Sequence, residues 1–598
     1  MILFFKKYSI VLWICFLVIL FLFFSKNIIK NFHGPIYGYG DTNNWEHTGY
    51  FLSEHLRLFP YPKIEFQNNG TLYPFGSNHV FQSWNFEKDF FWLIFYAVFG
   101  NGPWLKYYYL LSVLFTCGGS FWLLRQAFSI NKSFAISILL TFFNFYSILK
   151  YPYHLVYSDI HWIVLPVLLD YIILHLYFHE KEFSVKLFFF RLLFTVLSLG
   201  SELGYIAGFN LTSFVFTYAY LIFQLSREKK MGLAWNGIIL FIQGNRKFSA
   251  AIFASTTVIF LFYSNLIVQV LIHAKSLPMG EISEGVWWSN PLRIILPIFP
   301  HFMTSSNFWE NLFMDSPEGI ASGSIGWFLL LSGLLGLIHS KKKITAFYPF
   351  LFLLIFLLSY HPTKFPVLKI FPWFQYMRVS GRITFLTPVL FSIFATGIDF
   401  EKFRSRIGKL VFAVLLVIGL TELNHGYRLR LSIDSNLPKD FYPYMETIRN
   451  SKGEALLDWP FCIYGANFDT RLCPYYPVTI GAYSFTKFHH KKVIGQYYGR
   501  VHTSQIQPFL DYGWPGLFLH DERSQPLFPQ QKRCFNEEEW KKFEEFYRKY
   551  DFSGINLYTD VLGKECTEKF YQKFGNPVGQ TRIPYSGNMV FIPKHKIE

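Results

Sequence analysis

Residues 8–24 read YSIVLWICFLVILFLFF, an unbroken apolar run that directly follows Lys6 and Lys7. A helix needs roughly 20 apolar residues to cross the hydrocarbon core of a bilayer, and flanking lysines hold it at one surface. The run has the character of a signal peptide, but no small-x-small cleavage site follows it. We therefore expect a first transmembrane helix that is retained.

Further apolar blocks of similar length follow along the chain. The protein has 598 residues, of which 52% are hydrophobic and 16% are charged, whereas a soluble protein has about a quarter charged residues. The sequence thus predicts a polytopic α-helical membrane protein with about eleven transmembrane helices. The blocks are 8–24, 104–124, 133–149, 160–177, 187–200, 205–224, 249–272, 323–339, 345–359, 383–398 and 410–423.

The distribution of Lys and Arg predicts the orientation. If every block spans and the N-terminus is cytoplasmic, most basic loop residues fall on the inside, as the positive-inside rule requires. The same distribution accounts for much of the net charge of +16 and makes nucleic-acid binding unnecessary as an explanation. We expect a cell (inner) membrane protein with residues 1–424 as a helical bundle, a long first external loop at 25–103 and an extracytoplasmic domain at 425–598. The Phe- and Trp-rich segment 89–100 is too short to span and is expected to lie as a helix in the outer interface.

The last part of the chain is typical of a soluble α+β domain. Residues 454–458 and 554–558 have the composition of strands, and Asn536 with Glu539 forms a capping-box pattern before a helix. Four cysteines fall in this domain, an even number in an oxidising compartment. Spacing does not fix the connectivity, and we predict the sequential pairs Cys462–Cys473 and Cys534–Cys566. Zinc-site spacing with His is absent from the sequence.

The first external loop carries the strongest candidates for chemistry. Residues 34–47 read GPIYGYGDTNNWEH, which places Asp41 and Glu46 in a Gly-rich stretch beside Trp45, an aromatic suited to a sugar face. Residues 73–79, YPFGSNH, form a turn signature that ends in His79. A loop of this length also contains some acids and glycines without any function. Asp41 is the first candidate for a catalytic carboxylate, with Glu46 as an alternative.

Other polar residues lie at membrane depth or at its outer rim. Glu202 separates two apolar blocks, and Asp159 and His161 open another, so each is a functional candidate because burial of an ionisable group is costly. An interfacial position with a wet polar tip explains His161 equally well. The outer segment before a late span holds basic residues against the positive-inside bias. A bound phosphate explains them, as does pairing with lipid headgroups or with Glu281 or Asp315. These candidate ligand-binding residues are His361, Lys364, Arg378 and Arg382.

In layout the chain resembles the GT-C superfamily of membrane glycosyltransferases, and more narrowly its bacterial YfhO-type branch. The local matches are Gly40-Asp41 with Trp45, the 73–76 stretch YPFG, 377–385 (MRVSGRITF) and 489–500 (HHKKVIGQYYGR). Ser380 and Ile383 depart from the branch's Arg-x-Pro-x-Arg-Phe pattern, and Lys492 replaces a proline in the last motif.

The resemblance implies transfer of a sugar from a polyprenyl-phosphate donor to a glycan, lipid or protein acceptor on the outer face, with inversion. Asp41 would be the general base, with Glu46 or Glu202 as alternatives, and Arg378, Arg382 and Lys364 would stabilise the leaving phosphate. Some superfamily members use a divalent metal such as Mg or Mn, and the sequence leaves that cofactor open. Two other classes also stay open: a flippase or transporter of lipid-linked sugars, and a non-catalytic protein of envelope assembly.

Overall fold

The computed structural model describes most of the chain, and its residues group into two compact units. The first, called here the helical unit, comprises Met1–Lys30, Tyr107–Tyr263 and Glu281–Ser432. The second, the mixed unit, comprises Asn31–Lys106, Ser264–Gly280 and Ile433–Glu598. The first external loop therefore belongs to the same unit as the C-terminal residues. Described are residues 2–38, 40–180, 183–274, 325–339, 344–359, 371–374, 379–399, 405–429, 436–466, 469–526 and 528–595.

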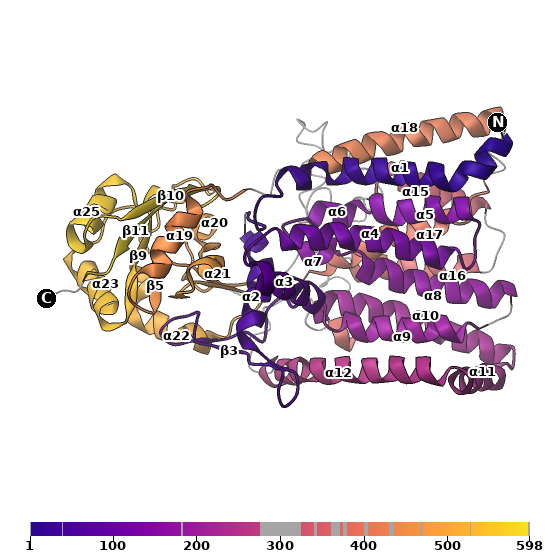
Figure 1. Ribbon diagram of the computed structural model, residues 1–598, viewed down its shortest axis with the longest axis horizontal. Coiled ribbons are helices and arrows are strands. Elements are labelled where there is room, and N and C mark those ends of the chain that lie inside the picture. The colour runs from indigo at the N-terminus through magenta and orange to yellow at the C-terminus, as the bar shows by residue number, and fades with distance from the viewer. Residues whose placement is uncertain are drawn as a thin grey trace. The chain divides into compact units, whose positions relative to one another are not determined.

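Each of the eleven predicted apolar blocks contains helix (Figure 1). Among the described residues, seven helical stretches are long and apolar enough to cross a membrane. The count of eleven stays a prediction, because the other four blocks form helical stretches of at most 16 residues. The helices are α1 (Ile2–Lys30), α4 (Trp104–Leu124), α5 (Ile130–Phe142), α6 (Phe145–Lys150), α7 (Leu155–Ser158), α8 (His161–Glu180), α9 (Val185–Ser198), α10 (Gly208–Arg227), α12 (Arg246–Ala274), α15 (Trp327–His339), α16 (Ile344–Ser359), α17 (Leu386–Ala395) and α18 (Arg406–Leu429).

One helix, α11 (Met231–Gly244), was not predicted. It lies between the predicted blocks 205–224 and 249–272, and its sequence MGLAWNGIILFIQG contains no charged residue. Fourteen residues are too few to span a bilayer, so the basic residues on either side dominated the pattern. None of its described side chains is buried.

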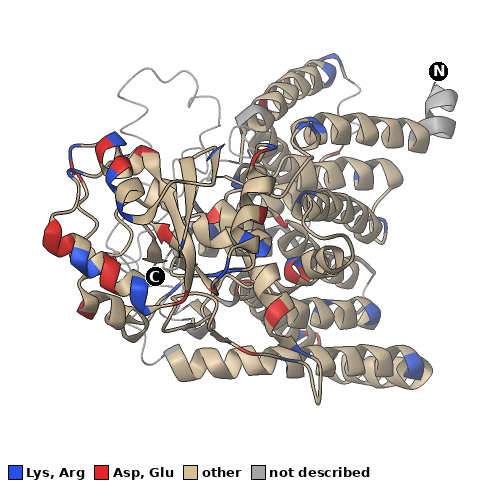
Figure 2. Ribbon diagram, turned by 60° about the vertical axis from the view of Figure 1, so that its left-hand side comes forward, with Lys and Arg blue, Asp and Glu red and all other residues tan. Residues whose placement is uncertain are grey.

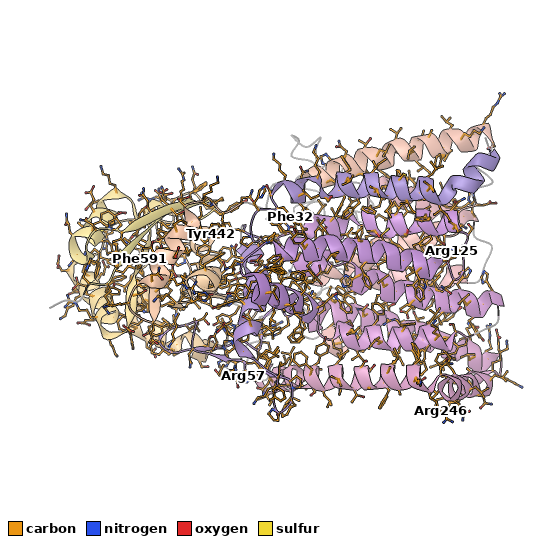
Figure 3. The ribbon with its side chains drawn as sticks, viewed as in Figure 1. Phe32, Arg57, Arg125, Arg246, Tyr442 and Phe591 are labelled. Atoms are coloured by element: carbon orange, nitrogen blue, oxygen red, sulfur yellow. A yellow bond between two sulfur atoms is a disulfide. The ribbon has the colours of Figure 1, made fainter. Side chains whose placement is uncertain are left out.

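The helical unit carries little charge along its helices, and Figure 2 shows most of its Lys and Arg near helix ends. Arg125, just after α4, and Arg246, at the start of α12, lie at the same end of the unit (Figure 3). An exception is a buried ion pair in which Arg191 donates to both oxygens of Asp170 at 2.8 and 3.0 Å. Ser213 Oγ donates to the same carboxylate at 2.8 Å, so the pair joins α8, α9 and α10. The buried charges are tolerated because the Arg191 guanidinium also donates to Thr195 Oγ1 and to the Asn210 carbonyl, so that both partners have several hydrogen bonds.

The C-terminal residues form the predicted mixture of helices and strands. A five-stranded sheet has the order β10-β11-β9-β5-β7, in which β5 is parallel to β7 and β9 and the other pairs are antiparallel. The strands are β5 (Ala455–Trp459), β7 (Lys492–Val493), β9 (Phe552–Tyr558), β10 (Gly579–Ile583) and β11 (Gly587–Pro593). Every residue of β5 and β9 is buried, as in a strand covered on both faces. The helices around the sheet include α19 (Phe441–Asn450), α21 (Thr486–His489), α22 (Thr503–Tyr512), α23 (Glu537–Lys549) and α25 (Lys564–Phe574).

Local predictions for this domain are confirmed. Helix α23 begins with the full capping box, because Asn536 accepts from the Glu539 amide while the Glu539 side chain accepts from the Asn536 amide. Both predicted strands are present as β5 and β9. Cys462 is bonded to Cys473 and Cys534 to Cys566, with Cα–Cα distances of 4.2 and 5.1 Å.

Part of residues 31–106, which include the predicted first external loop, packs against this core. Leu72 and Tyr73 belong to the same hydrophobic cluster as the sheet, and Tyr73 N–H donates to the Val493 carbonyl at 3.1 Å. The loop contains α2 (Asn44–His55), the predicted helix α3 (Phe86–Phe99), and the short ribbons β1–β2 (Leu56–Arg57 with Lys63–Ile64) and β3–β4 (Gln67–Asn68 with Ser77–Asn78). Its shape is therefore set by the C-terminal residues.

Candidate functional site

Asp41 lies in a single 3₁₀ turn, η1 (Gly40–Asn43), that leads directly into α2. The Asn43 side chain is hydrogen-bonded to the segment that precedes the turn. It accepts from Gly38 N–H at 3.3 Å and donates to the Gly38 carbonyl at 2.8 Å. Tyr37 is buried and its hydroxyl is hydrogen-bonded to Ser586 at 3.0 Å. The turn that carries Asp41 is thus fixed on its N-terminal side by a side chain from the turn itself and by one from the C-terminal sheet region.

Glu46, in the first turn of α2, is fixed by a buried ion pair. Its Oε2 accepts from Lys487 Nζ, and its Oε1 accepts from the Ile36 amide at 2.9 Å. The two side chains are 2% and 4% exposed. Both carboxylate oxygens therefore have a donor, as a buried charge requires. The pair joins residues 441 positions apart in the sequence and ties α2 to α21.

A second buried pair holds the other side of α2. Lys88 Nζ donates to Asp89 Oδ1 at 2.6 Å, to Thr48 Oγ1 at 2.8 Å and to the Trp45 carbonyl at 2.6 Å. All three ammonium protons are used, and both charged side chains are 0% exposed. Burial raises the pKa of Asp89 despite the neighbouring Lys88. Because the ammonium binds the carbonyl of Trp45, this pair fixes the start of α2 against α3.

Tyr483 lies close to Asp41. Burial raises the pKa of the Tyr483 phenol well above its usual range, and the negative charge of Asp41 adds to that shift. The Tyr483 hydroxyl donates to Asn44 Oδ1 at 3.3 Å. At Gly481 a Cβ atom would lie 2.7 Å from Asn43 Nδ2, so only glycine lets this segment approach the turn so closely. Asp41 itself is half-buried, whereas Glu46 is buried.

Two buried histidines complete the surroundings of α2. Both ring nitrogens of His79 are hydrogen-bonded: Nε2 is 2.9 Å from Thr71 Oγ1, and Nδ1 is 3.1 Å from Gln82 Nε2. His47 is 3% exposed, and its ring lies edge-on to Tyr483 at 4.8 Å. Burial, together with the charge of Lys487, lowers the pKa of His47 to about 3, so the ring is neutral at physiological pH. Burial likewise holds the pKa of His79 well below its usual range.

In the helical unit, Arg382 and Glu202 meet at one tyrosine. Arg382 Nη1 donates to Tyr157 Oη at 2.7 Å, and Tyr157 Oη donates to Glu202. The guanidinium lies over the rings of Tyr157 and Tyr205 at 4.5 and 4.9 Å from their centroids, and Nη2 is 3.4 Å from His154 Nε2. Glu202 has a left-handed backbone with φ of 34°. An arginine held in this way by aromatic faces is suited to binding an anion.

Several predicted site residues occupy places that their sequence patterns did not indicate. Trp45 is 2% exposed and lies against Lys88, so its ring is part of the core of the loop. Asp159 is buried and accepts from the Tyr108 hydroxyl at 3.2 Å, and His161 is buried beside Phe115. His361, Lys364 and Arg378 lie outside the described residues.

The residues that sequence reasoning missed are Lys487, Tyr483 and Tyr157. None of them carries a spacing signal, because each meets its partner only in the folded chain. Among the described residues, no three His, Cys, Asp or Glu side chains are grouped so as to hold a metal ion.

No family model and no curated protein matches the chain. Solved structures are similar to it over nearly its whole length. Archaeal oligosaccharyltransferase AglB from Archaeoglobus fulgidus, in complex with an inhibitory peptide and a dolichol-phosphate, has 13% identity and a TM-score of 0.38, covering 99% of this chain and 75% of that one. ArnT from Cupriavidus metallidurans in the apo state has 11% identity and a TM-score of 0.47, with 98% of both chains covered. The same protein bound to undecaprenyl phosphate has 10% identity and a TM-score of 0.38, covering 98% and 97%. All three TM-scores lie below 0.5, so the function proposed below rests on the residues of this chain.

Proposed function

We propose that the chain is an inverting membrane glycosyltransferase of the GT-C type, in its YfhO-like branch, which moves a sugar from a polyprenyl-phosphate donor to an acceptor. In this proposal the protein spans the cell (inner) membrane about eleven times with a cytoplasmic N-terminus. Residues 425–598 form the extracytoplasmic domain, and transfer occurs on that face. The sequence resemblance supports the reaction class, and the arrangement around Asp41 supports the assignment of roles.

The observation that carries the proposal is the fixed position of one half-buried carboxylate. Asp41 sits on a turn clamped by Asn43, Tyr37 and the Glu46–Lys487 pair. An acceptor hydroxyl must lose a proton as it attacks the anomeric carbon, and a carboxylate held within hydrogen-bond reach accepts it efficiently only when its geometry is preset. Rigid support of this kind around an acidic side chain is expected of a general base and is not required of a surface loop.

The other two acidic candidates are assigned different roles. Glu46 has both oxygens bound to fixed donors inside the protein, which suits a residue that positions α2. Glu202 accepts from Tyr157, which also contacts Arg382, and this suits a residue that orients the arginine. We therefore assign the proton transfer to Asp41 alone.

Arg382 is assigned to the phosphate of the donor. When the glycosidic bond breaks, negative charge grows on the lipid phosphate, and a fixed guanidinium stabilises it. Stacking on Tyr157 and Tyr205 restricts the side chain, so less entropy is lost when the anion binds. We keep Arg378 and Lys364 as further phosphate ligands and His361 as a further substrate contact.

The test compares three variants of matched shape. Asp41→Asn retains the size of the side chain but cannot accept a proton, so transfer of labelled sugar should fall about 10²–10⁴-fold with donor binding unchanged. Glu46→Gln should mainly lower the thermal stability, and Glu202→Gln should mainly weaken donor binding. Transfer by Asp41→Asn within a few-fold of the wild-type rate would remove Asp41 from the mechanism.

A further inference from the structure

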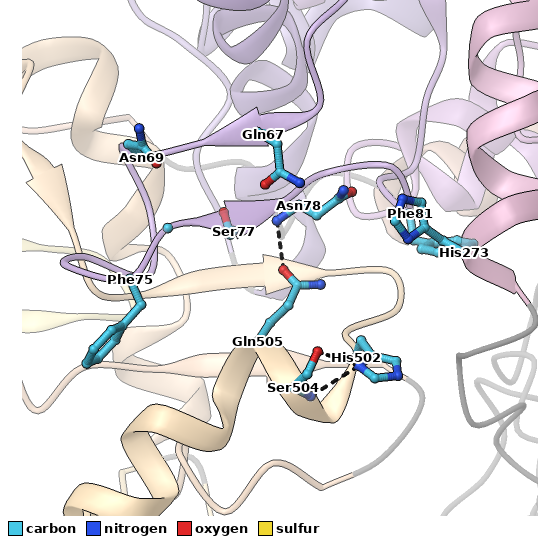
Figure 4. A pocket seen from close by; sticks show the side chains of 11 residues that line it. Gln67, Asn69, Phe75, Ser77, Asn78, Phe81, His273, His502, Ser504 and Gln505 are labelled. Atoms are coloured by element: carbon cyan, nitrogen blue, oxygen red, sulfur yellow. Dashed lines mark hydrogen bonds between the residues drawn. The ribbon is translucent and has the colours of Figure 1, made fainter.

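A groove in the mixed unit is lined largely by amide and aromatic side chains. It has a volume of about 320 Å³ and lies between the β3–β4 ribbon, the start of α22 and His273 near the end of α12 (Figure 4). Four amide side chains line it, together with the rings of Phe75 and Phe81. None of its eleven lining residues is Asp, Glu, Lys or Arg. The amides are Gln67, Asn69, Asn78 and Gln505.

The frame of the groove is fixed by hydrogen bonds that leave amide groups available. The Asn78 backbone N–H donates to Gln505 Oε1 at 2.7 Å and so ties β4 to α22, while Asn78 Oδ1 accepts from the Val80 amide at 2.9 Å. In the part of the chain that the structure describes, these bonds leave Gln505 Nε2 and Asn78 Nδ2 to donate elsewhere. Figure 4 shows Gln67 on β3 and Gln505 on α22 pointing into the space beside Asn78.

The lining selects for a particular class of ligand. A primary amide offers two donors and an acceptor, which matches the paired hydroxyls of a sugar ring. Phe75 is 45% exposed and packs edge-on against Phe509 at 5.1 Å, so it presents a supported apolar surface of the kind that covers the C–H face of a pyranose. Phosphates and carboxylates are normally bound by Arg or Lys, and neither residue type is among the eleven that line the groove.

The volume of the groove further limits the class of ligand. Ligand pockets in proteins commonly measure about 300–1,000 Å³, and this groove is at the lower end of that range. A small saccharide fits such a space better than an extended peptide or a lipid tail. The mixture of hydrophobic rings and a few oriented polar groups is the usual composition of a small-molecule site.

We propose that this amide groove, formed by Gln67, Asn78, Gln505 and Phe75 with their neighbours, binds an uncharged saccharide. The inference deepens the proposed glycosyltransferase function, since either the acceptor or the transferred sugar supplies such a group. The chemistry of the ligand is inferred from the lining of the groove alone. The inference rests on the proposed glycosyltransferase function only for where the saccharide comes from.

Binding is tested on the full-length protein in a detergent without a sugar headgroup, since an alkyl glycoside would occupy the groove. The probes are neutral di- to tetrasaccharides of glucose, galactose, mannose and N-acetylglucosamine, detected by saturation-transfer NMR and titrated to a Kd. Gln67→Ala and Phe75→Leu should each weaken the binding about tenfold, because each removes one contact and neither residue ties β4 to α22. Gln507→Ala is the matched control, since Gln507 is exposed on α22, its side-chain amide donates to Asp511 at 2.7 Å, and it is not among the residues that line the groove. The assignment would be overturned if no probe binds the wild type, or if Gln67→Ala and Phe75→Leu bind the probes as tightly as the wild type does.

The two sources of the saccharide are separated by kinetics. If the groove holds the acceptor, Gln67→Ala raises the KM for the acceptor and leaves the KM for the lipid-linked donor unchanged, and the reverse holds for a donor sugar. Asp41→Asn should bind the probes as tightly as the wild type. If the wild type binds a saccharide but transfers no sugar, the groove assignment stands and the proposed glycosyltransferase function is wrong. If the wild type transfers sugar but the groove variants change neither KM nor Kd, the glycosyltransferase function stands and the groove assignment is wrong.

Discussion

Replacing Lys487 by Met tests whether the buried ion pair with Glu46 holds the candidate site together. The substitution keeps the length and the apolar stem of the side chain. Among the described residues it leaves the Glu46 carboxylate with one hydrogen-bond donor, the Ile36 amide at 2.9 Å. Removing one partner of a fully buried pair typically costs about 3–5 kcal/mol, because the remaining charge is left without compensation. For a domain of 150–250 residues this lowers Tm by roughly 6–20 °C.

A surface pair in the same unit provides the control. Lys492 and Glu454 are 2.5 Å apart, but their side chains are 36% and 44% exposed, so Lys492→Met should cost only about 0–1 kcal/mol. The double variant Lys487→Met with Glu46→Gln removes both buried charges and should recover much of the lost stability. The assay is thermal unfolding of the full-length protein in detergent, followed by circular dichroism. A Tm for Lys487→Met no lower than that of Lys492→Met, or no recovery in the double variant, would refute the reasoning.

Three further predictions concern other parts of the molecule. Burial raises the pKa of Asp458 to about 7, above its value in the unfolded chain, so its contribution to stability is present at low pH and is lost as pH rises toward 7. Asp458→Asn should abolish that loss, which is on the order of 3 kcal/mol between pH 5 and pH 8, the two pH values at which chemical unfolding measures it. Arg382→Lys keeps the charge but loses the planar contact with Tyr157 and Tyr205. Titration with polyprenyl phosphate should therefore show about tenfold weaker binding at an unchanged Tm. Unaltered binding would indicate that Arg382 contacts lipid headgroups instead. Alkaline phosphatase fused after Glu598 should be active, since the C-terminus is expected outside the cytoplasm, and activity of a cytoplasmic reporter at that position would reverse the topology.

Much of the helical unit could be predicted from the sequence because a bilayer imposes a simple rule. A segment that is long and apolar must be helical, since its backbone has no other hydrogen-bonding partners in lipid. The block 104–124 matches α4 residue for residue. Helix α11 was missed because the rule applies to length, and a 14-residue apolar helix between basic residues does not satisfy it.

In the C-terminal domain, local signals were equally informative. The capping box at Asn536 fixes the start of α23 within the segment itself, and the strand composition of 554–558 identifies part of β9. The pairing of Cys462 with Cys473 also joins nearby residues. Each of these features depends on a short stretch of chain.

The candidate site was less predictable because its contacts are long-range. Asp41 was identified from its Gly-rich setting, but Lys487 and Tyr483 reach its neighbourhood from more than 400 positions away. Trp45 was predicted to contact a sugar because it is an aromatic residue beside an acid. In the structure its ring is buried against Lys88. A single sequence contains no signal that distinguishes an exposed ring from one covered by a distant segment.

The most direct measurement of the central claim follows the bond between sugar and lipid phosphate. The purified wild-type protein is incubated in vesicles with a panel of polyprenyl-phosphate sugars, labelled in the sugar, and candidate glycan, lipid and protein acceptors, with Asp41→Asn in parallel. A glycosyltransferase should release free polyprenyl phosphate as the label enters a product, with the anomeric configuration inverted, and Asp41→Asn should release it about 10²–10⁴-fold more slowly. Movement of the intact lipid-linked sugar across the vesicle membrane with no cleavage of that bond would contradict the claim and identify a flippase.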